Sequence, residues 1–272
     1  MNNTCELCGF NNPKGTVTGL IIKDGKVLTF KRIEEPFKGK FDFPGGYMNV
    51  DETPEKAIKR EIKEELGVDC EATFIGWFPG TASWKGKKYA VLSHAFLVEP
   101  KGELRLNKKE NSAMKFFEIS KLKSIAFDSN VEILNFIKKN FVFDYKTLLK
   151  LINQLDPSAK VNEVNLYKSV LDGYISKKIV NGKLVGVGWI FPRRTFLRKQ
   201  AVIEDVIVDI KERGKGYGKD ITLDLMRWAR ETGVEVIELT SGSHRVPANE
   251  LYKKVGFKLH PTNHYLYFVD KK

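Results

Sequence analysis

The chain has 272 residues, 42% of them hydrophobic, which suits two domains of ordinary size with real cores. No run of eighteen apolar residues occurs, which argues against a membrane-spanning helix, and three cysteines fit a reducing cytoplasm better than a disulfide framework. The net charge of +12 is uneven, because residues 1–140 carry 23 basic and 19 acidic side chains and residues 141–272 carry 23 and 15. A positive surface of this kind attracts polyanions, and without a recognisable nucleic-acid module it favours small anionic ligands over nucleic acid.

At the N-terminus, Cys5 and Cys8 have the C-x-x-C spacing of half a zinc site. A closed structural site needs four ligands, and the chain has no second C-x-x-C pair. We therefore expect residues 5–8 to be a remnant knuckle, or one that a partner chain completes. The basic and then apolar pattern of a signal peptide does not occur there.

The next segments predict a sheet followed by helices. Residues 16–22 and 26–31 are apolar-rich runs on either side of Asp24-Gly25, which predicts a hairpin. Further strands are predicted at residues 89–98 and 114–119, and the apolar spacing of residues 130–140 predicts a closing helix.

Residues 54–66 carry strong signals for a helix. Thr53 can cap its N-terminus, Pro54 suits the first helical position, and Gly67 suits the C-cap. Ala57, Ile58, Ile62 and Leu66 can form its core-facing stripe. Glu61, Glu64 and Glu65 stand at i, i+3 and i+4, so their carboxylates share one face.

Three carboxylates so close together repel one another unless a positive charge lies among them. Hard divalent cations such as Mg²⁺ bind through oxygen and often join a few carboxylates to substrate phosphate oxygens. A solvated acidic helix face is the simpler explanation of such a pattern. The preceding Gly45-Gly46 turn, Glu52 and Arg60 favour a functional site instead.

The run from Gly46 to Val68 has the form G-x5-E-x7-R-E-U-x-E-E-x-G-U, where U is apolar, with every fixed position filled. It resembles the signature of the Nudix hydrolases. The resemblance implies an α/β/α sandwich with a mixed sheet over residues 1–140 and Mg²⁺- or Mn²⁺-dependent attack of water on a diphosphate. It implies that Glu61, Glu64 and Glu65 hold the metal with the Gly45 carbonyl, and that one of the paired glutamates serves as base. The remaining implied site residues are the Arg60–Glu52 ion pair and Glu110.

The second half begins with segments that read as helical or mixed, at residues 141–152 and 164–180. Asn181-Gly182 then predicts a hairpin that leads into residues 184–190. A nearly continuous apolar strand at 202–208 is followed by a glycine-rich turn and an amphipathic stretch at 221–232. Such a strand, turn and helix N-terminus present backbone N–H groups and a helix dipole to a pyrophosphate.

The pattern R-x-x-G-x-G, the strand at 236–240 and the segment 245–257 together resemble the GNAT acyltransferases over residues 142–272, and we place this domain at 141–272. The resemblance implies a central mixed, mostly antiparallel sheet and transfer of an acetyl group from acetyl-CoA to an amine. Tyr252 would protonate the departing thiolate, and Glu204 or Asp205 would hold or deprotonate the amine, although a strand-edge carboxylate can be plain surface. The residues implied to bind CoA are Arg213, Gly214, Lys215, Gly216, Tyr217, Gly218, Lys219 and, as an assistant, Asn249.

We therefore expect a cytoplasmic bifunctional enzyme that acts on a nucleotide diphosphate and an amine, with no membrane partner and with a homodimer as one assembly it could form. One alternative is that one domain senses a nucleotide and regulates the other. Another is that the first domain cleaves the diphosphate of CoA, since Gly39 to Gly46 resembles part of that pattern. An RNA-processing hydrolase is the fourth reading.

Overall fold

The computed structural model describes residues 9–10, 12–84, 86–109 and 111–267, and the chain divides into two compact units. The first unit consists of Met1–Leu149 and Lys160–Asp172, and the second of Lys150–Ala159 and Gly173–Lys272. Helix α3 (Tyr145–Leu155) begins in the first unit and ends in the second. The single boundary between residues 140 and 141 stays a prediction.

The first unit is built on two sheets. The one with the longer strands, which we call the larger sheet, has the strand order β5-β1-β7-β6. In it β1 and β7 are parallel and the other pairs antiparallel. In the smaller sheet β3 lies between β2 and β4 and also pairs with β8. The strands are β1 (Lys14–Leu20), β2 (Ile22–Lys23), β3 (Lys26–Arg32), β4 (Phe41–Asp42), β5 (Gly45–Tyr47), β6 (Asp69–Trp84), β7 (Lys87–Lys101) and β8 (Asn111–Glu118).

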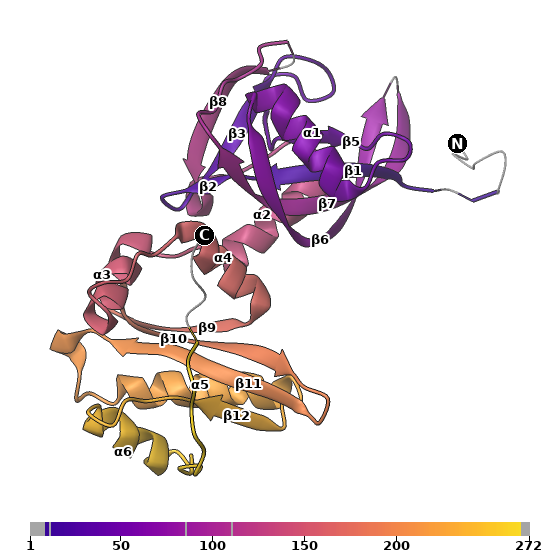
Figure 1. Cartoon of the computed structure of the whole chain (residues 1–272). Coiled ribbons are helices and arrows are strands. Elements are labelled where there is room, and N and C mark those ends of the chain that lie inside the picture. The colour runs from indigo at the N-terminus through magenta and orange to yellow at the C-terminus, as the bar shows by residue number, and fades with distance from the viewer. Residues whose placement is uncertain (1–8, 11, 85, 110, 268–272) are drawn as a thin grey trace. The chain divides into compact units, whose positions relative to one another are not determined.

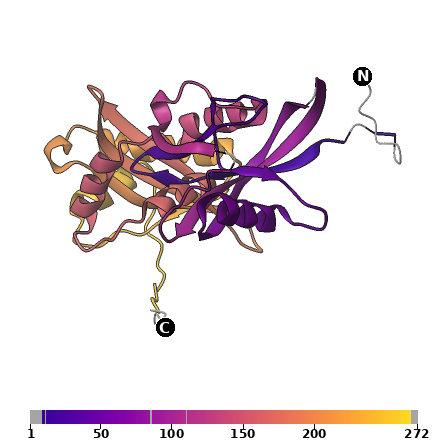
Figure 2. The same cartoon turned by 90° about the horizontal axis from the view of Figure 1, so that it is seen from above.

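Two helices cover opposite faces of the larger sheet, α1 (Pro54–Leu66) and α2 (Asp128–Asn140) (Figure 2). Successive side chains of a strand point to opposite faces. Accordingly, Ala95 and Leu97 of β7 pack in the cluster that includes α2, whereas Phe96 and Val98 pack with α1. This arrangement confirms the predicted α/β/α sandwich with a mixed sheet.

The short elements of this unit follow the turn chemistry of the sequence. Lys23 pairs with Lys26 around Asp24 and Gly25, which both have positive φ, so the hairpin prediction is confirmed. After β8 the chain makes a short 3₁₀ turn, η1 (Ile119–Lys121), before α2. Helix α4 (Glu163–Asp172) also belongs to this unit.

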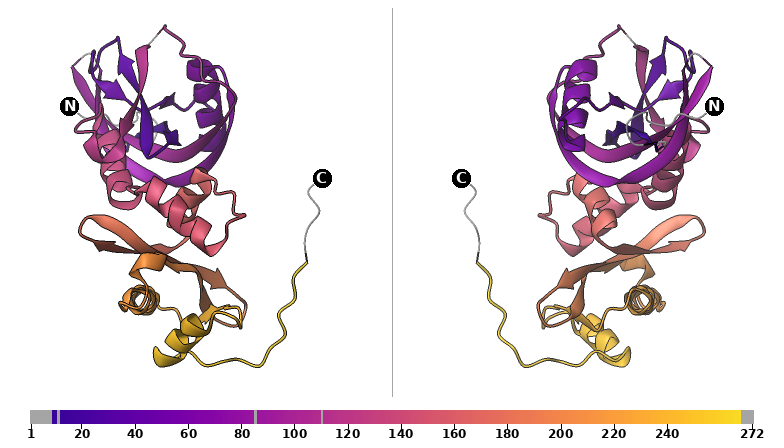
Figure 3. Two further views of the ribbon diagram at one scale, coloured as in Figure 1. Left: turned by 90° about the vertical axis from the view of Figure 1, so that its left-hand side faces the viewer. Right: turned by 90° about the vertical axis from the view of Figure 1, so that its right-hand side faces the viewer.

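The second unit contains a four-stranded sheet of order β12-β11-β10-β9 (Figure 1). Only the β11–β12 pair is parallel, which confirms the mixed, mostly antiparallel sheet. Helix α5 packs across β9, β10 and β11, and Figure 3 shows it end-on against one face of the sheet. The elements are β9 (Tyr174–Val180), β10 (Lys183–Arg194), β11 (Lys199–Val208), η2 (Ile210–Glu212), α5 (Tyr217–Glu231), β12 (Val236–Leu239) and α6 (Val246–Lys254).

Among the described residues, no helix is both long and apolar enough to cross a membrane.

Candidate active sites

Helix α1 has the ends that its sequence predicts. The Thr53 hydroxyl accepts a hydrogen bond from the Lys56 N–H at 3.3 Å, and Pro54 occupies the first turn. Gly67 closes the helix in the left-handed conformation at φ 70°, and its N–H donates to the Lys63 carbonyl. The predicted apolar stripe of Ala57, Ile58, Ile62 and Leu66 is buried.

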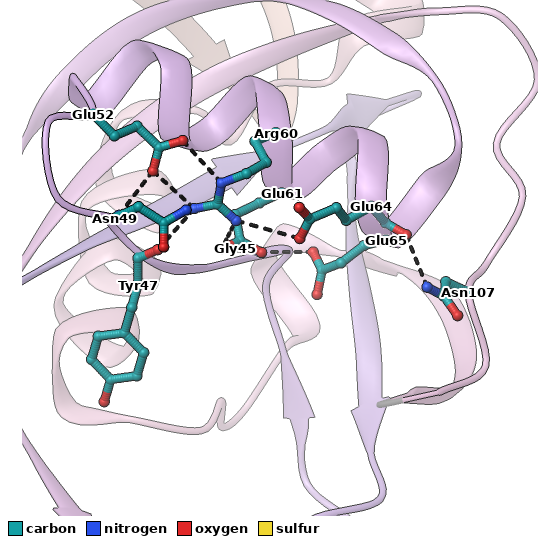
Figure 4. Close-up of polar contacts among 9 residues, drawn as sticks. All are labelled: Gly45, Tyr47, Asn49, Glu52, Arg60, Glu61, Glu64, Glu65 and Asn107. Atoms are coloured by element: carbon teal, nitrogen blue, oxygen red, sulfur yellow. Dashed lines mark hydrogen bonds and ion pairs between the residues drawn. The ribbon is translucent and has the colours of Figure 1, made fainter.

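Arg60 joins the acidic residues around this helix (Figure 4). Its Nε and Nη2 donate to the two Glu52 carboxylate oxygens at 2.9 and 3.0 Å, a bidentate pair. Its Nη1 donates to Glu61 at 2.8 Å and to Glu64 at 3.3 Å, and Nη2 also reaches the Tyr47 carbonyl at 2.9 Å. The guanidinium therefore fixes Glu52 and helps to neutralise two of the three glutamates.

These contacts shift the pKa values of both members of the ion pair. Hydrogen bonds from Arg60, and then from the Asn49 N–H, hold the pKa of Glu52 below its usual range. The Glu52 hydrogen bond in turn raises the pKa of Arg60, although partial burial opposes the shift. Both groups are charged at neutral pH, as the predicted ion pair requires.

Two glycines let strand β5 lie close to its neighbours, Gly46 to helix α1 and Gly45 to strand β1. A Cβ on Gly46 would lie 2.5 Å from a Glu61 carboxylate oxygen, so any other residue would displace that side chain. Gly45 has φ +139°, and a Cβ there would lie 2.1 Å from the Val17 carbonyl. The Gly45 N–H donates to Glu65 at 2.9 Å. The turn before the helix therefore forms a cradle around the carboxylates.

A loop that sequence reasoning did not assign covers the C-terminal end of α1. The Asn107 N–H donates to the Glu65 carbonyl at 2.8 Å, and its side chain donates to the Glu64 carbonyl at 3.1 Å. Helix C-termini leave carbonyls without intrahelical partners, and these bonds satisfy two of them beside the acidic set. Asn111 adds a long 3.5 Å contact to the Glu65 carboxylate. Nothing in the sequence spacing indicated these roles.

The three glutamates share one side of α1, as predicted, but their carboxylates bond in different directions (Figure 4). Glu61 and Glu64 bond Arg60, while Glu65 bonds the Gly45 N–H. Within the described ranges, no three acidic, histidine or cysteine side chains gather tightly enough to enclose a metal ion as they stand. Glu110, Cys5 and Cys8, which were also predicted to act here or to form a knuckle, lie outside the described residues.

A buried polar network adjoins the glutamates. Asp42 accepts hydrogen bonds from Asn130 at 2.7 Å and Arg32 at 3.3 Å, and Thr18 donates to Asn130 at 2.9 Å. Burial raises the pKa of Asp42 to about 7 even though Arg32 opposes the shift. A cavity of about 40 Å³ lies here, and its polar lining includes Arg32, Asp42 and Glu65.

In the second unit the glycine-rich turn leads into a helix as predicted, although α5 begins at Tyr217, earlier than the expected amphipathic stretch. Gly214 and Gly216 have φ of 78° and 85°, conformations that glycine adopts without strain. The first N–H groups of a helix have no intrahelical partners, so this end can receive an anion.

A cleft of about 1210 Å³ opens at this helix end. Its wall includes most of the residues predicted to bind CoA, namely Arg213, Gly214, Gly216, Tyr217, Gly218 and Lys219. Lys215 and Asn249 are outside that lining: Lys215 pairs with Glu212 at 2.8 Å, and Asn249 donates to the Gly242 carbonyl at 3.0 Å. His244, Arg245 and His264 line the cleft as well, although no motif marked them as site residues.

Both acidic candidates and Tyr252 line the same cleft. The strand pairing shifts opposite Glu204, and Asp205 has φ 53°, so a bulge brings adjacent carboxylates to one wall. Burial, and then the charge of Asp205, raise the pKa of Glu204, while His264 lowers it. Burial likewise raises the pKa of Tyr252, so its hydroxyl stays protonated at neutral pH.

Comparisons with known proteins agree with each site. Residues 13–138 match the model of the NUDIX domain, and residues 154–257 match that of the acetyltransferase (GNAT) family. An ADP-ribose pyrophosphatase of Methanocaldococcus jannaschii is 34% identical over 129 residues, which are 47% of this chain and 75% of that protein. A glucosamine 6-phosphate N-acetyltransferase of Trypanosoma brucei brucei is 30% identical over 128 residues, 43% of this chain and 84% of that protein.

Among solved structures, a MutT NUDIX hydrolase from Burkholderia pseudomallei is similar at 26% identity with a TM-score of 0.40, covering 46% of this chain and 97% of that one. The two sites and the two matches define an enzyme with two catalytic domains. The chain belongs to the Nudix hydrolases through its first domain and to the GNAT N-acetyltransferases through its second.

Proposed function

We propose that the first domain hydrolyses a nucleoside diphosphate linked to another moiety, with Mg²⁺ or Mn²⁺, and that the second transfers an acetyl group from acetyl-CoA to an amine. The Arg60 network is the observation on which the first half depends, because it holds Glu61 and Glu64 on the helix that lies against the Gly45-Gly46 turn, where Glu65 accepts from the Gly45 N–H. The relative from Methanocaldococcus jannaschii makes ADP-ribose the first substrate to test.

The donor set fits a hard divalent cation, since carboxylates and a backbone carbonyl are the ligands such an ion prefers. Glu61, Glu64, Glu65 and the Gly45 carbonyl would hold it, and when bound it would polarise a phosphoryl oxygen. In our proposal Glu64 takes a proton from water, the water oxygen bonds to phosphorus, and the bridging P–O bond breaks. Arg60 keeps Glu61 and Glu64 in place through this step. Glu110 remains an additional proposed catalytic residue.

For the second reaction, the start of α5 would hold the diphosphate of acetyl-CoA in the cleft, through Arg213 to Lys219. Glu204, with Asp205 beside it, would accept the proton of the acceptor amine as its nitrogen bonds to the thioester carbon. The C–S bond then breaks, and Tyr252 protonates the thiolate. The raised pKa values of Glu204 and Tyr252 support these roles, because a base titrating nearer neutrality and a protonated phenol are what the two steps need.

A hydrolysis panel tests the first half, with ADP-ribose, NADH, dinucleoside polyphosphates and CoA as substrates. Wild type should release the nucleoside monophosphate, and Glu64→Gln should lower kcat about 10²- to 10⁴-fold at an unchanged melting temperature. Equal turnover by both proteins would refute the assignment. A nucleotide that alters acetyl transfer without being consumed would instead support a sensor domain.

Acetyl transfer to a panel of amines tests the second half. Tyr252→Phe should lower kcat while acetyl-CoA binding, measured by calorimetry, stays within about twofold of wild type. Equal losses of kcat and of binding would argue against an acid role for Tyr252.

A further inference from the structure

Three side chains from adjacent strands meet at the surface of the first unit. They are Lys14 on β1, Tyr47 on β5 and Tyr89 on β7, and we call them the tyrosine platform. The two phenol oxygens are 2.6 Å apart and hydrogen-bonded. The Lys14 ammonium lies 4.9 Å from the centre of the Tyr89 ring and 6.0 Å from that of Tyr47. Each ring is thus held both at its hydroxyl and by a cation.

The tyrosine platform adjoins the glutamate site along the chain. Tyr47 directly follows Gly46, the glycine against which the Glu61 carboxylate lies, and its own carbonyl accepts from Arg60. Its side chain points away from α1 and the carboxylates (Figure 4). The backbone of Tyr47 therefore contacts the Arg60 network, while its ring points away from that network.

The rings lie on the sheet face that also carries the buried polar network. Tyr89 and Ser93 are four residues apart on β7, hence on one face, and the Ser93 hydroxyl bonds that of Thr18 at 2.8 Å. Thr18 also donates to Asn130, which in turn donates to Asp42 in the lining of the small cavity. The platform and that cavity therefore share one side of the sheet.

The chemistry of this surface suits a flat aromatic ligand. Tyr47 remains 46% exposed although its hydroxyl is bonded to that of Tyr89, so part of this residue is accessible to a ligand. Stacking of a nucleobase on an aromatic side chain is sequence-tolerant and contributes strongly to binding. The simpler alternative is that the tyrosines only cover the edge strand β5. That role would not require the Tyr47 side chain to stay exposed.

We propose that Tyr47 and Tyr89, steadied by Lys14, form the stacking surface for the base of the nucleoside-diphosphate substrate. The inference rests on the proposed hydrolase function, and it names these tyrosines as the residues that separate base-bearing substrates from simple diphosphates. They are positioning and specificity residues, and the bond-breaking step stays with the glutamates.

Calorimetric titration measures the contribution of the base to binding separately from that of the diphosphate, and it requires no turnover. The probes are α,β-methylene-ADP and methylenediphosphonate, each with Mg²⁺, and the proteins are wild type, Tyr47→Leu, Tyr89→Leu and Tyr47→Phe. We expect the leucine variants to bind α,β-methylene-ADP about 5- to 150-fold more weakly and methylenediphosphonate within twofold of wild type. Tyr47→Phe keeps the ring and should lose no more than about threefold.

Trp77→Leu is the matched control. Trp77 is 64% exposed and pairs with His94, an odd number of residues from Tyr89, so it lies on the opposite face of the sheet. Its loss should leave both affinities unchanged. Equal weakening of both probes by Tyr47→Leu, no weakening of either, or a Phe variant as weak as Leu would overturn the stacking role. Failure of wild type to bind α,β-methylene-ADP would instead refute the proposed function, and this inference with it.

Discussion

Arg60 shows how one side chain can hold an acidic cluster together. Its guanidinium is bidentate to Glu52 and reaches Glu61 and Glu64 with its remaining donors. An isolated surface ion pair contributes little, but a bidentate arginine within a network fixes geometry. Arg60 thus orients the carboxylates, and its charge limits their mutual repulsion.

Glu52→Gln should lower the rate of diphosphate hydrolysis about 10- to 100-fold, as loss of a supporting partner typically does. Its neutral amide can no longer form the charge-assisted pair that holds Arg60. The check is steady-state kinetics with the substrate that wild type hydrolyses best.

Glu55→Gln is the control for that change, because Glu55 pairs with Lys59 on the same helix at 2.6 Å but with exposed side chains. Its rate should stay within twofold of wild type. A rate for Glu52→Gln that matches this control would show that the ion pair has no part in catalysis.

Asp42 predicts a pH dependence of stability. Its pKa is about 7 in the folded chain against an ordinary 3.8, so between these values the folded state binds the extra proton. The free energy of unfolding therefore falls as pH rises from about 4 to 7, and the contribution is fully lost above the folded pKa.

Asp42→Asn removes this ionisation and can keep a hydrogen bond to Asn130. Its free energy of unfolding, relative to wild type, should rise by about 1–3 kcal/mol between pH 4.5 and pH 8. Urea unfolding of both proteins at the two pH values measures the difference. A difference that stays constant with pH would contradict the raised pKa.

Helix α1 and strand β5 are in close contact, because Gly46 lets the Glu61 carboxylate lie against the strand. Gly46→Ala should lower kcat for hydrolysis at least tenfold, since its Cβ would meet that carboxylate at 2.5 Å. Gly76→Ala on β6 is the matched control. The nearest atom to its new Cβ would be a ring carbon of Phe78, at an ordinary contact distance of 3.5 Å. Equal kcat values for the two variants would show that the close approach is unimportant.

The local elements were predictable because their signals are local. The caps and buried stripe of α1, the Asp24-Gly25 hairpin and the glycine turn before α5 all follow from adjacent residues. The Asp42–Asn130 bond, in contrast, joins residues 88 positions apart. Asn107 reaches Glu64 across 43 positions. One sequence carries no record of such pairings, since tertiary packing alone brings them together.

At the scale of the whole chain, helix α4 follows α3 in the sequence but packs on the core of the first unit. Tyr167 of α4 is fully buried and packs on Phe141, with ring centres 5.0 Å apart. Its hydroxyl donates to Glu163, which also accepts the N–H groups of Asp24 and Gly25. Helix α4 therefore completes the hydrolase unit, whose core extends beyond residue 140.

Tyr167→Ala should destabilise the first unit by about 3–5 kcal/mol, the usual effect of removing a large buried aromatic ring. Tyr265→Ala serves as the comparison, because Tyr265 is 83% exposed. Thermal unfolding of the two variants, followed through loss of diphosphate hydrolysis, gives the answer. Equal midpoints would mean that α4 contributes nothing to the hydrolase unit.

The account depends most on a divalent cation bound by the glutamates of α1. Mn²⁺ titration followed by electron paramagnetic resonance measures that binding directly, with wild type compared to Glu61→Gln/Glu65→Gln. We predict a saturable Mn²⁺ site in wild type that the double variant loses while its circular dichroism spectrum stays the same. An unchanged number of Mn²⁺ ions bound by the double variant would contradict the assignment.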